Sequence, residues 1–97
     1  MFVASMSLDL LLGDVTSLKQ KRGVVRPIVA EMGRRYAVSA AEVGHQDLYR
    51  RAEIGVALAT GDPGHGSTVL DAVERWCAAR PEVELLSVRR WLRSDED

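Results

Sequence analysis

Apolar and polar residues alternate along residues 2–12. The even positions of this segment are all apolar, whereas Ser5, Ser7 and Asp9 occupy odd positions. A period of two places successive side chains on opposite faces of a strand. We therefore expect a first strand with one buried face and one face in contact with water.

The next segment has the spacing of an amphipathic helix. Apolar residues recur at steps of three and four positions from Leu18 to Tyr36, which places them on one side of a helix. Thr16 or Ser17 has a side chain that can cap the first turn. We expect the helix to cover the apolar face of the first strand.

A proline interrupts this helical pattern. Pro27 lacks a backbone N–H, and its ring clashes with the preceding turn, at a cost of about 3 kcal/mol if the helix stays straight. The sequence therefore predicts either a kink near Gly23 and Val24 or a helix that restarts close to Arg26.

Two further strands and a second helix follow. Residues 38–43 form a short strand candidate, and Ile54, Val56 and Leu58 alternate with small or polar residues in a third strand. A Gly-Asp-Pro-Gly turn at residues 61–64 leads to a second helix. We expect Ser67 or Thr68 to cap that helix.

Residues 83–92 form the last strand, whose inward face is ambiguous. Val83 and Leu85 point to one side, whereas Leu86 and Val88 point to the other. A uniform strand cannot bury both sets of apolar side chains on the same face. The pattern therefore predicts a bulge or a change of register in this strand.

The order strand, helix, strand, strand, helix, strand predicts an α+β protein with a ferredoxin-like βαββαβ fold. Its four-stranded antiparallel sheet carries both helices on one face, which leaves the other face uncovered. We expect residues 1–93 to form a single domain and residues 94–97 to form an acidic, frayed tail.

Composition places the chain among ordinary globular proteins. Of its 97 residues, 46% are hydrophobic and 28% are charged, which argues against disorder. The single Cys77 excludes an intrachain disulfide and is expected to pack in the core. No signal peptide or membrane span is expected, so we predict a cytoplasmic location without membrane contact.

Charge is distributed unevenly along the chain. The net charge is −1, but residues 17–36 contain six cations and one acid, Glu31. The cations lack acidic partners at i+4 spacing, so we expect their repulsion to be uncompensated within the helix. This segment is predicted to bind a polyanion such as RNA through Lys19, Lys21, Arg22, Arg26, Arg34 and Arg35.

Three segments together resemble the YlxP-like family of small bacterial proteins. They are residues 17–22 (SLKQKR), residues 38–43 (VSAAEV), and residues 45–48 (HQDL) followed by residues 51–56 (RAEIGV). The resemblance implies a ferredoxin-like fold and a bacterial cytoplasmic protein. It also implies an association with ribosome assembly or translation, because the family is often grouped with ribosome-binding factors. It brings no catalytic residues.

Enzymatic and ligand sites have little support in the sequence. Residues 61–68 place glycines as in a phosphate-binding loop, but Ser67 stands where the lysine is required. His45, Asp47 and Tyr49 form a titratable cluster that we interpret as local hydrogen bonding rather than as a metal or catalytic site. We expect no enzymatic activity, no cofactor, no metal and no small-molecule substrate.

Two functional hypotheses remain open. The first is a non-enzymatic RNA- or ribosome-associated module that contacts ribosomal RNA or a ribosomal subunit through the basic helix. RNA is expected on the helical side, because Asp9 and Glu53 on the uncovered sheet face would repel phosphate. The alternative is a homo-oligomeric interaction module, such as a homodimer, that uses the uncovered sheet face.

Overall fold

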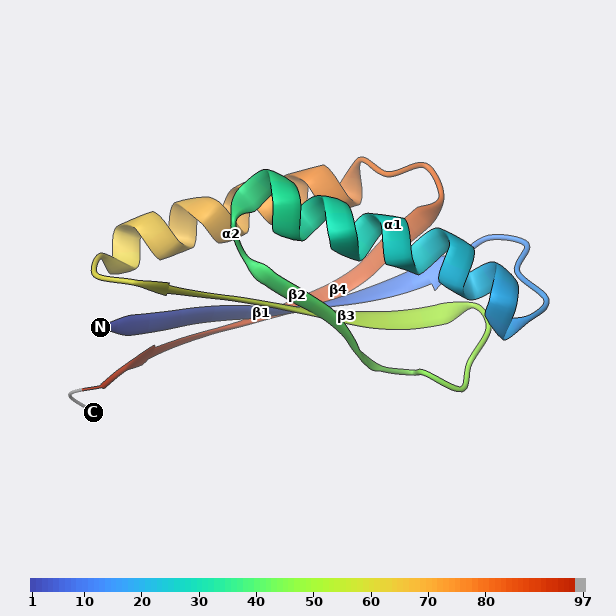
Figure 1. The fold of residues 1–97 in the computed structure, drawn as a ribbon, viewed down its shortest axis with the longest axis horizontal. Coiled ribbons are helices and arrows are strands. Elements are labelled where there is room, and N and C mark those ends of the chain that lie inside the picture. The colour runs from blue at the N-terminus through green and yellow to red at the C-terminus, as the bar shows by residue number, and fades with distance from the viewer. Residues whose placement is uncertain (96–97) are drawn as a thin grey trace.

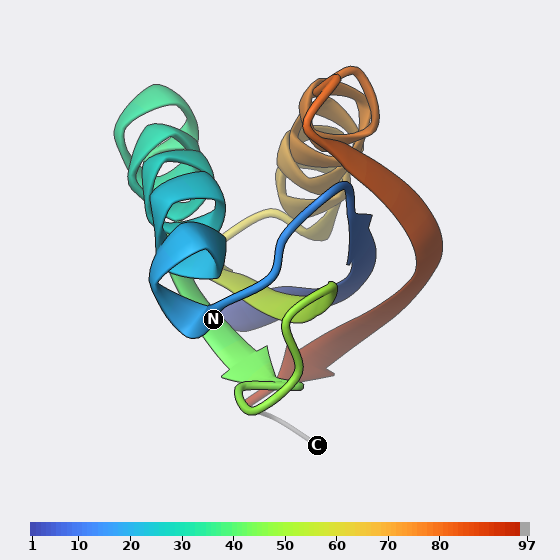
Figure 2. The ribbon, with the colours of Figure 1, turned by 90° about the vertical axis from the view of Figure 1, so that its right-hand side faces the viewer.

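The structure is a computed structural model, which describes residues 1–95. Its elements are β1 (Phe2–Leu12), α1 (Leu18–Tyr36), β2 (Ser39–Gly44), β3 (Arg51–Thr60), α2 (Pro63–Ala78) and β4 (Val83–Ser94). The strands form one sheet in the order β2-β3-β1-β4, and all neighbours are antiparallel. Both helices lie on the same face of this sheet (Figures 1 and 2). The predicted ferredoxin-like βαββαβ fold is confirmed.

The core lies between the helices and the two central strands. The even positions of β1 from Ala4 to Leu12 are at most 2% exposed, as the alternation predicted. Those from Ala4 to Leu10 pair with the even positions of β3, so that Met6 lies opposite Val56 and Leu8 opposite Ile54. Burial of these apolar side chains is the main favourable term that holds the helices on the sheet.

Helix α1 begins at a side-chain cap. The backbone N–H of Gln20 donates to Ser17 Oγ at 3.1 Å, and the side chain of Gln20 accepts from the N–H of Thr16 at 2.7 Å. These bonds satisfy N–H groups that have no partner within the helix, so α1 starts at Leu18. Its buried positions are Lys21, Val25, Ile28 and Met32.

Pro27 lies inside α1 without interrupting it. The helix is continuous from Leu18 to Tyr36, so the alternative of a helix that restarts close to Arg26 is wrong. Because Pro27 has no N–H, the carbonyl of Gly23 has no donor within the helix. Both residues are exposed. Water can therefore bond the Gly23 carbonyl, which lowers the cost of the proline.

Helix α2 begins earlier than predicted. Neither Ser67 nor Thr68 caps it, because both lie inside the helix. The N-cap is Asp62, whose Oδ1 accepts from the N–H of Gly64 at 2.9 Å. Pro63 is the first helical residue, a position where the missing N–H has no intrahelical partner to lose.

Strand β4 contains the predicted irregularity. Asp9 lies opposite Ser87 and Leu10 opposite Leu85, so Leu86 is an extra residue without a partner on β1. The bulge restores the inward orientation of Val88, which pairs with Leu8. An unbroken alternation from Val83 would place each residue after the bulge on one face of the sheet. The bulge moves each of these side chains to the opposite face.

Strand β4 extends one residue into the predicted tail. Strand β4 includes Ser94, the first residue of the predicted tail, and the N–H of Asp95 donates to the carbonyl of Met1 at 3.2 Å. The remainder of the predicted tail, residues 96–97, lies outside the described residues. In residues 1–95 neither helix combines the length and the apolar character that crossing a membrane requires.

Candidate nucleic-acid interface

Three cations of α1 form an exposed basic face. Lys19, Arg22 and Arg26 are spaced by three and four residues, and all three are exposed on the same side of the helix. They surround a shallow hollow of about 420 Å³ that Gly23 and Pro27 also line. Among residues 1–95, no carboxylate makes an ion pair with any of the three.

Lys21 is the first correction to the predicted site. Its side chain is 3% exposed, and its ammonium group lies 2.9 Å from Glu42 Oε2 and donates to the carbonyl of His45 at 2.6 Å. The expectation that Lys21 is available to a nucleic acid is therefore wrong. Lys21 instead fastens α1 to β2 and to the loop that follows β2.

The sequence contained a signal for the burial of Lys21. Lys21 lies three positions after Leu18 and four before Val25, on the apolar stripe of the helix. A lysine on such a stripe requires a buried anion. Glu42 supplies it from the inward face of β2, opposite Ile54.

Arg34 and Arg35 are the second correction. Both guanidinium groups pair with Glu31, which lies three and four residues before them; Arg35 Nε is 3.4 Å from Glu31 Oε1. The expectation that the helix lacks acidic partners is wrong at this end. Both arginines remain exposed, but the carboxylate cancels part of their charge.

The loop after β2 contains no compact catalytic cluster. His45 has a positive φ of 57° and directs Nε2 toward Asp9 of β1, at 3.6 Å from Oδ1, whereas Asp47 and Tyr49 are exposed. Asp9 also accepts a 2.6 Å hydrogen bond from Arg51, which raises the pKa of that guanidinium. In the described chain no group of three His, Cys, Asp or Glu side chains could hold a metal.

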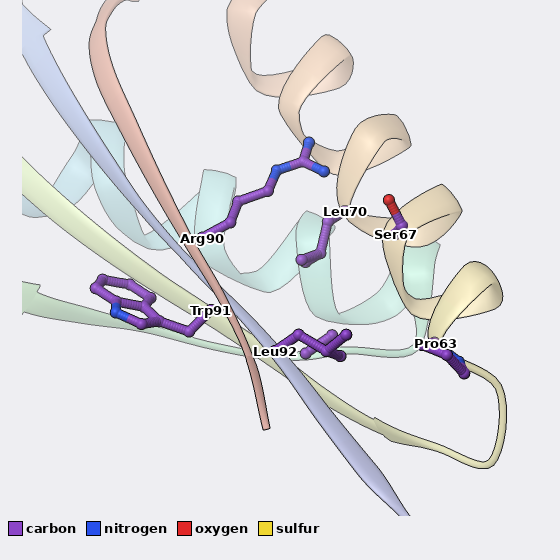
Figure 3. A pocket seen from close by; sticks show the side chains of 7 residues that line it. Pro63, Ser67, Leu70, Arg90, Trp91 and Leu92 are labelled. Carbon is purple, nitrogen blue, oxygen red and sulfur yellow. The ribbon is translucent and has the colours of Figure 1, made fainter. Parts of the chain in front are cut away.

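The face of the sheet opposite the helices, which we call the open sheet face, carries a tryptophan that the sequence did not place. Trp91 lies opposite Ser5 on β1 and is 42% exposed. Arg90 reaches toward α2, whereas Trp91 points away from the helices (Figure 3). The bulge at Leu86 determines this orientation, and so sequence spacing alone left it ambiguous.

Asp9 and Glu53, two acids of the open sheet face, are paired with arginines. Asp9 bonds Arg51, and Glu53 lies 3.6 Å from Arg89 and accepts a hydrogen bond from Ser7. The predicted positions of both carboxylates on this face are correct. Their negative charge is balanced locally, so the face is neither strongly negative nor strongly positive.

A second cavity lies between the first turns of α2 and the end of β4 (Figure 3). It has a volume of about 230 Å³ and is lined by Ala4, Pro63, Ser67, Leu70, Arg90, Trp91 and Leu92. Burial lowers the pKa of Arg90, but hydrogen bonds to Asp71 and Glu74 raise it by more, so the guanidinium stays charged and paired. The cavity therefore offers no unpaired charge to a ligand.

Cys77 lies in the core as expected. Its side chain is 0% exposed, and burial raises the pKa of its thiol to about 11. The thiolate, which is the reactive form, is therefore scarce at neutral pH. The thiol has the properties of a packing residue.

Comparisons with known proteins agree with the resemblance seen in the sequence. The family described as "Protein of unknown function (DUF503)" matches residues 3–90. The uncharacterized protein YlxP of Bacillus subtilis (strain 168) is 29% identical over 76 residues, which cover 78% of this chain and 83% of that protein. The expected YlxP-like relationship, and with it the bacterial character of the chain, is confirmed.

A solved structure is similar in fold alone. The de novo designed protein LFR1 1, which has a ferredoxin fold, superposes with a TM-score of 0.56 at 9% sequence identity. The match covers 98% of this chain and 88% of the designed chain. At this identity the likeness concerns only the arrangement of strands and helices.

Proposed function

The chain belongs to the DUF503 family of proteins of unknown function, and we propose that it is a non-enzymatic RNA-binding module of the bacterial cytoplasm. Its partner in this proposal is ribosomal RNA or a ribosomal subunit. The choice of a ribosomal target follows from the resemblance to the YlxP-like family. The choice of the binding surface follows from the distribution of charge on α1.

The exposed basic face of α1 is the observation that carries the proposal. Lys19, Arg22 and Arg26 remain in solvent without an acidic partner among residues 1–95, whereas the other three cations of the helix are paired. Unpaired clustered cations raise the local potential, and they gain counterion release when they meet phosphates. The three cations of this face are therefore better placed to bind a polyanion than the three paired cations of the same helix.

The spacing of the three cations also suits a nucleic-acid strand. Steps of three and four residues rise about 4.5 and 6 Å along a helix, comparable to the separation of successive phosphates. Gly23 lines the hollow between these side chains, and it has no side chain that would fill the hollow. A phosphodiester backbone that follows the helix axis can therefore meet each cation in turn.

This arrangement predicts binding through phosphates without base readout. Contacts to phosphates position a nucleic acid but carry no sequence information. We expect affinity to fall as the salt concentration rises. Each phosphate contact should contribute about −0.9 to the slope of log affinity against log salt on a duplex, and about −0.7 on a single strand. Three contacts give a slope of about −2 to −3.

The test is fluorescence anisotropy of labelled ribosomal RNA fragments over a salt series. The variant K19Q/R22Q/R26Q should bind at least tenfold more weakly at low salt and lose most of the slope. The variant R34Q/R35Q/R75Q removes the same formal charge from other helical positions, two of which pair with Glu31. It should lose much less affinity.

Equal losses in the two triple variants would contradict the assignment to the exposed basic face. Binding of the wild type that does not depend on salt would contradict the RNA proposal itself. The target is tested separately by sedimentation of tagged protein from bacterial lysate at two salt concentrations. Co-sedimentation with a ribosomal fraction at low salt and its loss at high salt are expected.

A further inference from the structure

The open sheet face combines a protruding tryptophan with a trough of small side chains. In the row of Trp91, the residues on the next three strands are Ser5, Ala57 and Ser39. The adjacent row contains Ala41 and Gly55 next to Ser7. These residues line a shallow hollow of about 400 Å³ together with Met6, Val43, Glu53, Val56 and Trp91.

Large apolar side chains border this trough. Trp91 is 42% exposed at its β4 side and Val43 is 55% exposed at its β2 side. A Cβ atom on Gly55 would lie 2.9 Å from Val43 Cγ1, so the glycine leaves the space that the valine occupies. Within residues 1–95, neither helix covers this face (Figure 2).

We propose that the open sheet face binds the same face of a second copy of this chain. A two-fold axis parallel to the strands, between β1 and β3, turns each sheet over and reverses the order of its strands. This operation places β4 of one copy over β2 of the other. Trp91 of each copy then inserts into the trough that Ser39 and Ala57 line on the other copy.

Shape favours a second copy as the occupant. A two-fold interface is self-complementary, so it requires a projection and a matching hollow on one surface. The row of Trp91 provides both, on opposite sides of the axis. Two stacked sheets lie about 10 Å apart, a gap that an indole standing on one sheet can fill.

Charge also favours a second copy over a nucleic acid. The open sheet face carries Asp9 paired with Arg51 and Glu53 paired with Arg89. Glu84 and Arg93 lie on the same face, opposite Leu11 and Val3, so the face carries equal numbers of acids and arginines, and two copies do not repel each other through net charge. Glu53 lines the trough, and its carboxylate would repel a strand of phosphates that entered it.

The available area is adequate for a dimer of moderate affinity. Four strands about 4.8 Å apart, with a mean length of about ten residues, cover about 600 Å² of sheet face. A standard interface buries about 800 Å² on each partner, so the open sheet face supplies most of that area. The exposed basic face of α1 lies on the opposite side of the sheet and stays free in the dimer.

The proposal is tested by sedimentation equilibrium from about 1 μM to 1 mM, the range in which such a dimer should dissociate. Wild type should change from monomer to dimer within this range. W91A should raise the dissociation constant at least tenfold. L48A, which truncates an exposed apolar side chain in the loop between β2 and β3, should change it less than twofold.

A second variant separates loss of the dimer from loss of the fold. A57E places a charge at the centre of the trough and should also yield a monomer, while its circular dichroism and thermal midpoint stay near the wild-type values. A monomeric wild type at 1 mM would overturn the proposal, and so would a dimer that W91A and A57E leave intact. In the W76F variant, Trp91 is the remaining tryptophan. Quenching of its fluorescence by single-stranded RNA, at concentrations where the variant is monomeric, would assign the face to base stacking instead.

Discussion

Lys19 and Lys21 stand two positions apart on α1, and their ammonium groups occupy opposite environments. Lys19 lies in solvent with Arg22 and Arg26. Lys21 lies beneath the helix, where Glu42 and the carbonyl of His45 bind it. A lysine on the outer side of α1 thus lies in solvent, whereas a lysine on the inner side is buried and ion-paired.

The comparison shows that formal charge overstates what a helix presents to a partner. Six cations on α1 reduce to three that have no acidic partner among residues 1–95. A buried pair contributes little to the field outside the protein, because each charge cancels the other at short range. The inner side of α1 therefore serves stability, and we propose that the outer side serves binding.

The largest expected effect comes from removing the inner lysine. K21M leaves the Glu42 carboxylate without its cation at a site that is only 25% exposed. We expect a loss of about 3 kcal/mol in the free energy of unfolding, because an unpaired charge in a poorly hydrated site is costly. Urea denaturation followed by circular dichroism measures this loss.

The matched control is K19M on the outer side. It removes the same charge from an exposed position and should change the free energy of unfolding by less than about 0.5 kcal/mol. The double variant K21M/E42L should recover part of the loss, because it removes both charges and retains apolar volume. Equal effects of K21M and K19M would contradict the structural role of Lys21.

A smaller effect is expected from the proline on the outer side. P27A supplies a backbone N–H that can bond the carbonyl of Gly23, and alanine has the highest helix propensity. The gain is reduced because proline also restricts the unfolded chain. We expect a net increase of about 1 kcal/mol in the free energy of unfolding, measured in the same urea experiment.

R26A, one position away on the same exposed surface, is the control for this substitution. It changes a side chain without adding a backbone donor, so stability should stay within about 0.5 kcal/mol of the wild type. If P27A is instead destabilising, the helix depends on the proline for its geometry. Hydration of the Gly23 carbonyl would then not explain how α1 tolerates the proline.

The fold could be predicted because local patterns agreed with one another. The alternation in β1, the helical spacing of α1 and the order of six elements all indicated a βαββαβ sheet. The start of α2 could have been predicted correctly, but the prediction of a cap at Ser67 or Thr68 places it too late. An aspartate before a proline, here Asp62 and Pro63, is typical of an N-cap and a first helical residue.

The candidate site could be predicted only in part, because ion pairing depends on the tertiary fold. The partner of Lys21 is Glu42, which comes from another element, and only the packing of α1 against β2 brings the two together. The side on which Trp91 lies depends on the single unpaired residue Leu86. A one-residue change of register reverses every side chain beyond it.

The smallest expected effect concerns the far end of α1, where Glu31 pairs with Arg34 and Arg35. E31Q removes the carboxylate and leaves both guanidinium groups exposed and uncompensated. These groups lie about 12 Å along the helix from Arg26, a distance that exceeds the screening length of about 8 Å at physiological salt but not that of about 30 Å at 0.01 M. We therefore expect RNA affinity to rise about threefold at low salt and to return to the wild-type value at higher salt.

The control for this last variant is E74Q. Glu74 lies on α2 and pairs with Arg90 of β4, so E74Q changes the net charge by the same amount at a distant place. If both variants raise RNA affinity by the same factor, the gain reflects net charge rather than the location of the arginines. If only E31Q does so, the RNA path extends along α1 from the exposed basic face toward Tyr36, because counterion release requires the added cations to lie near the phosphates.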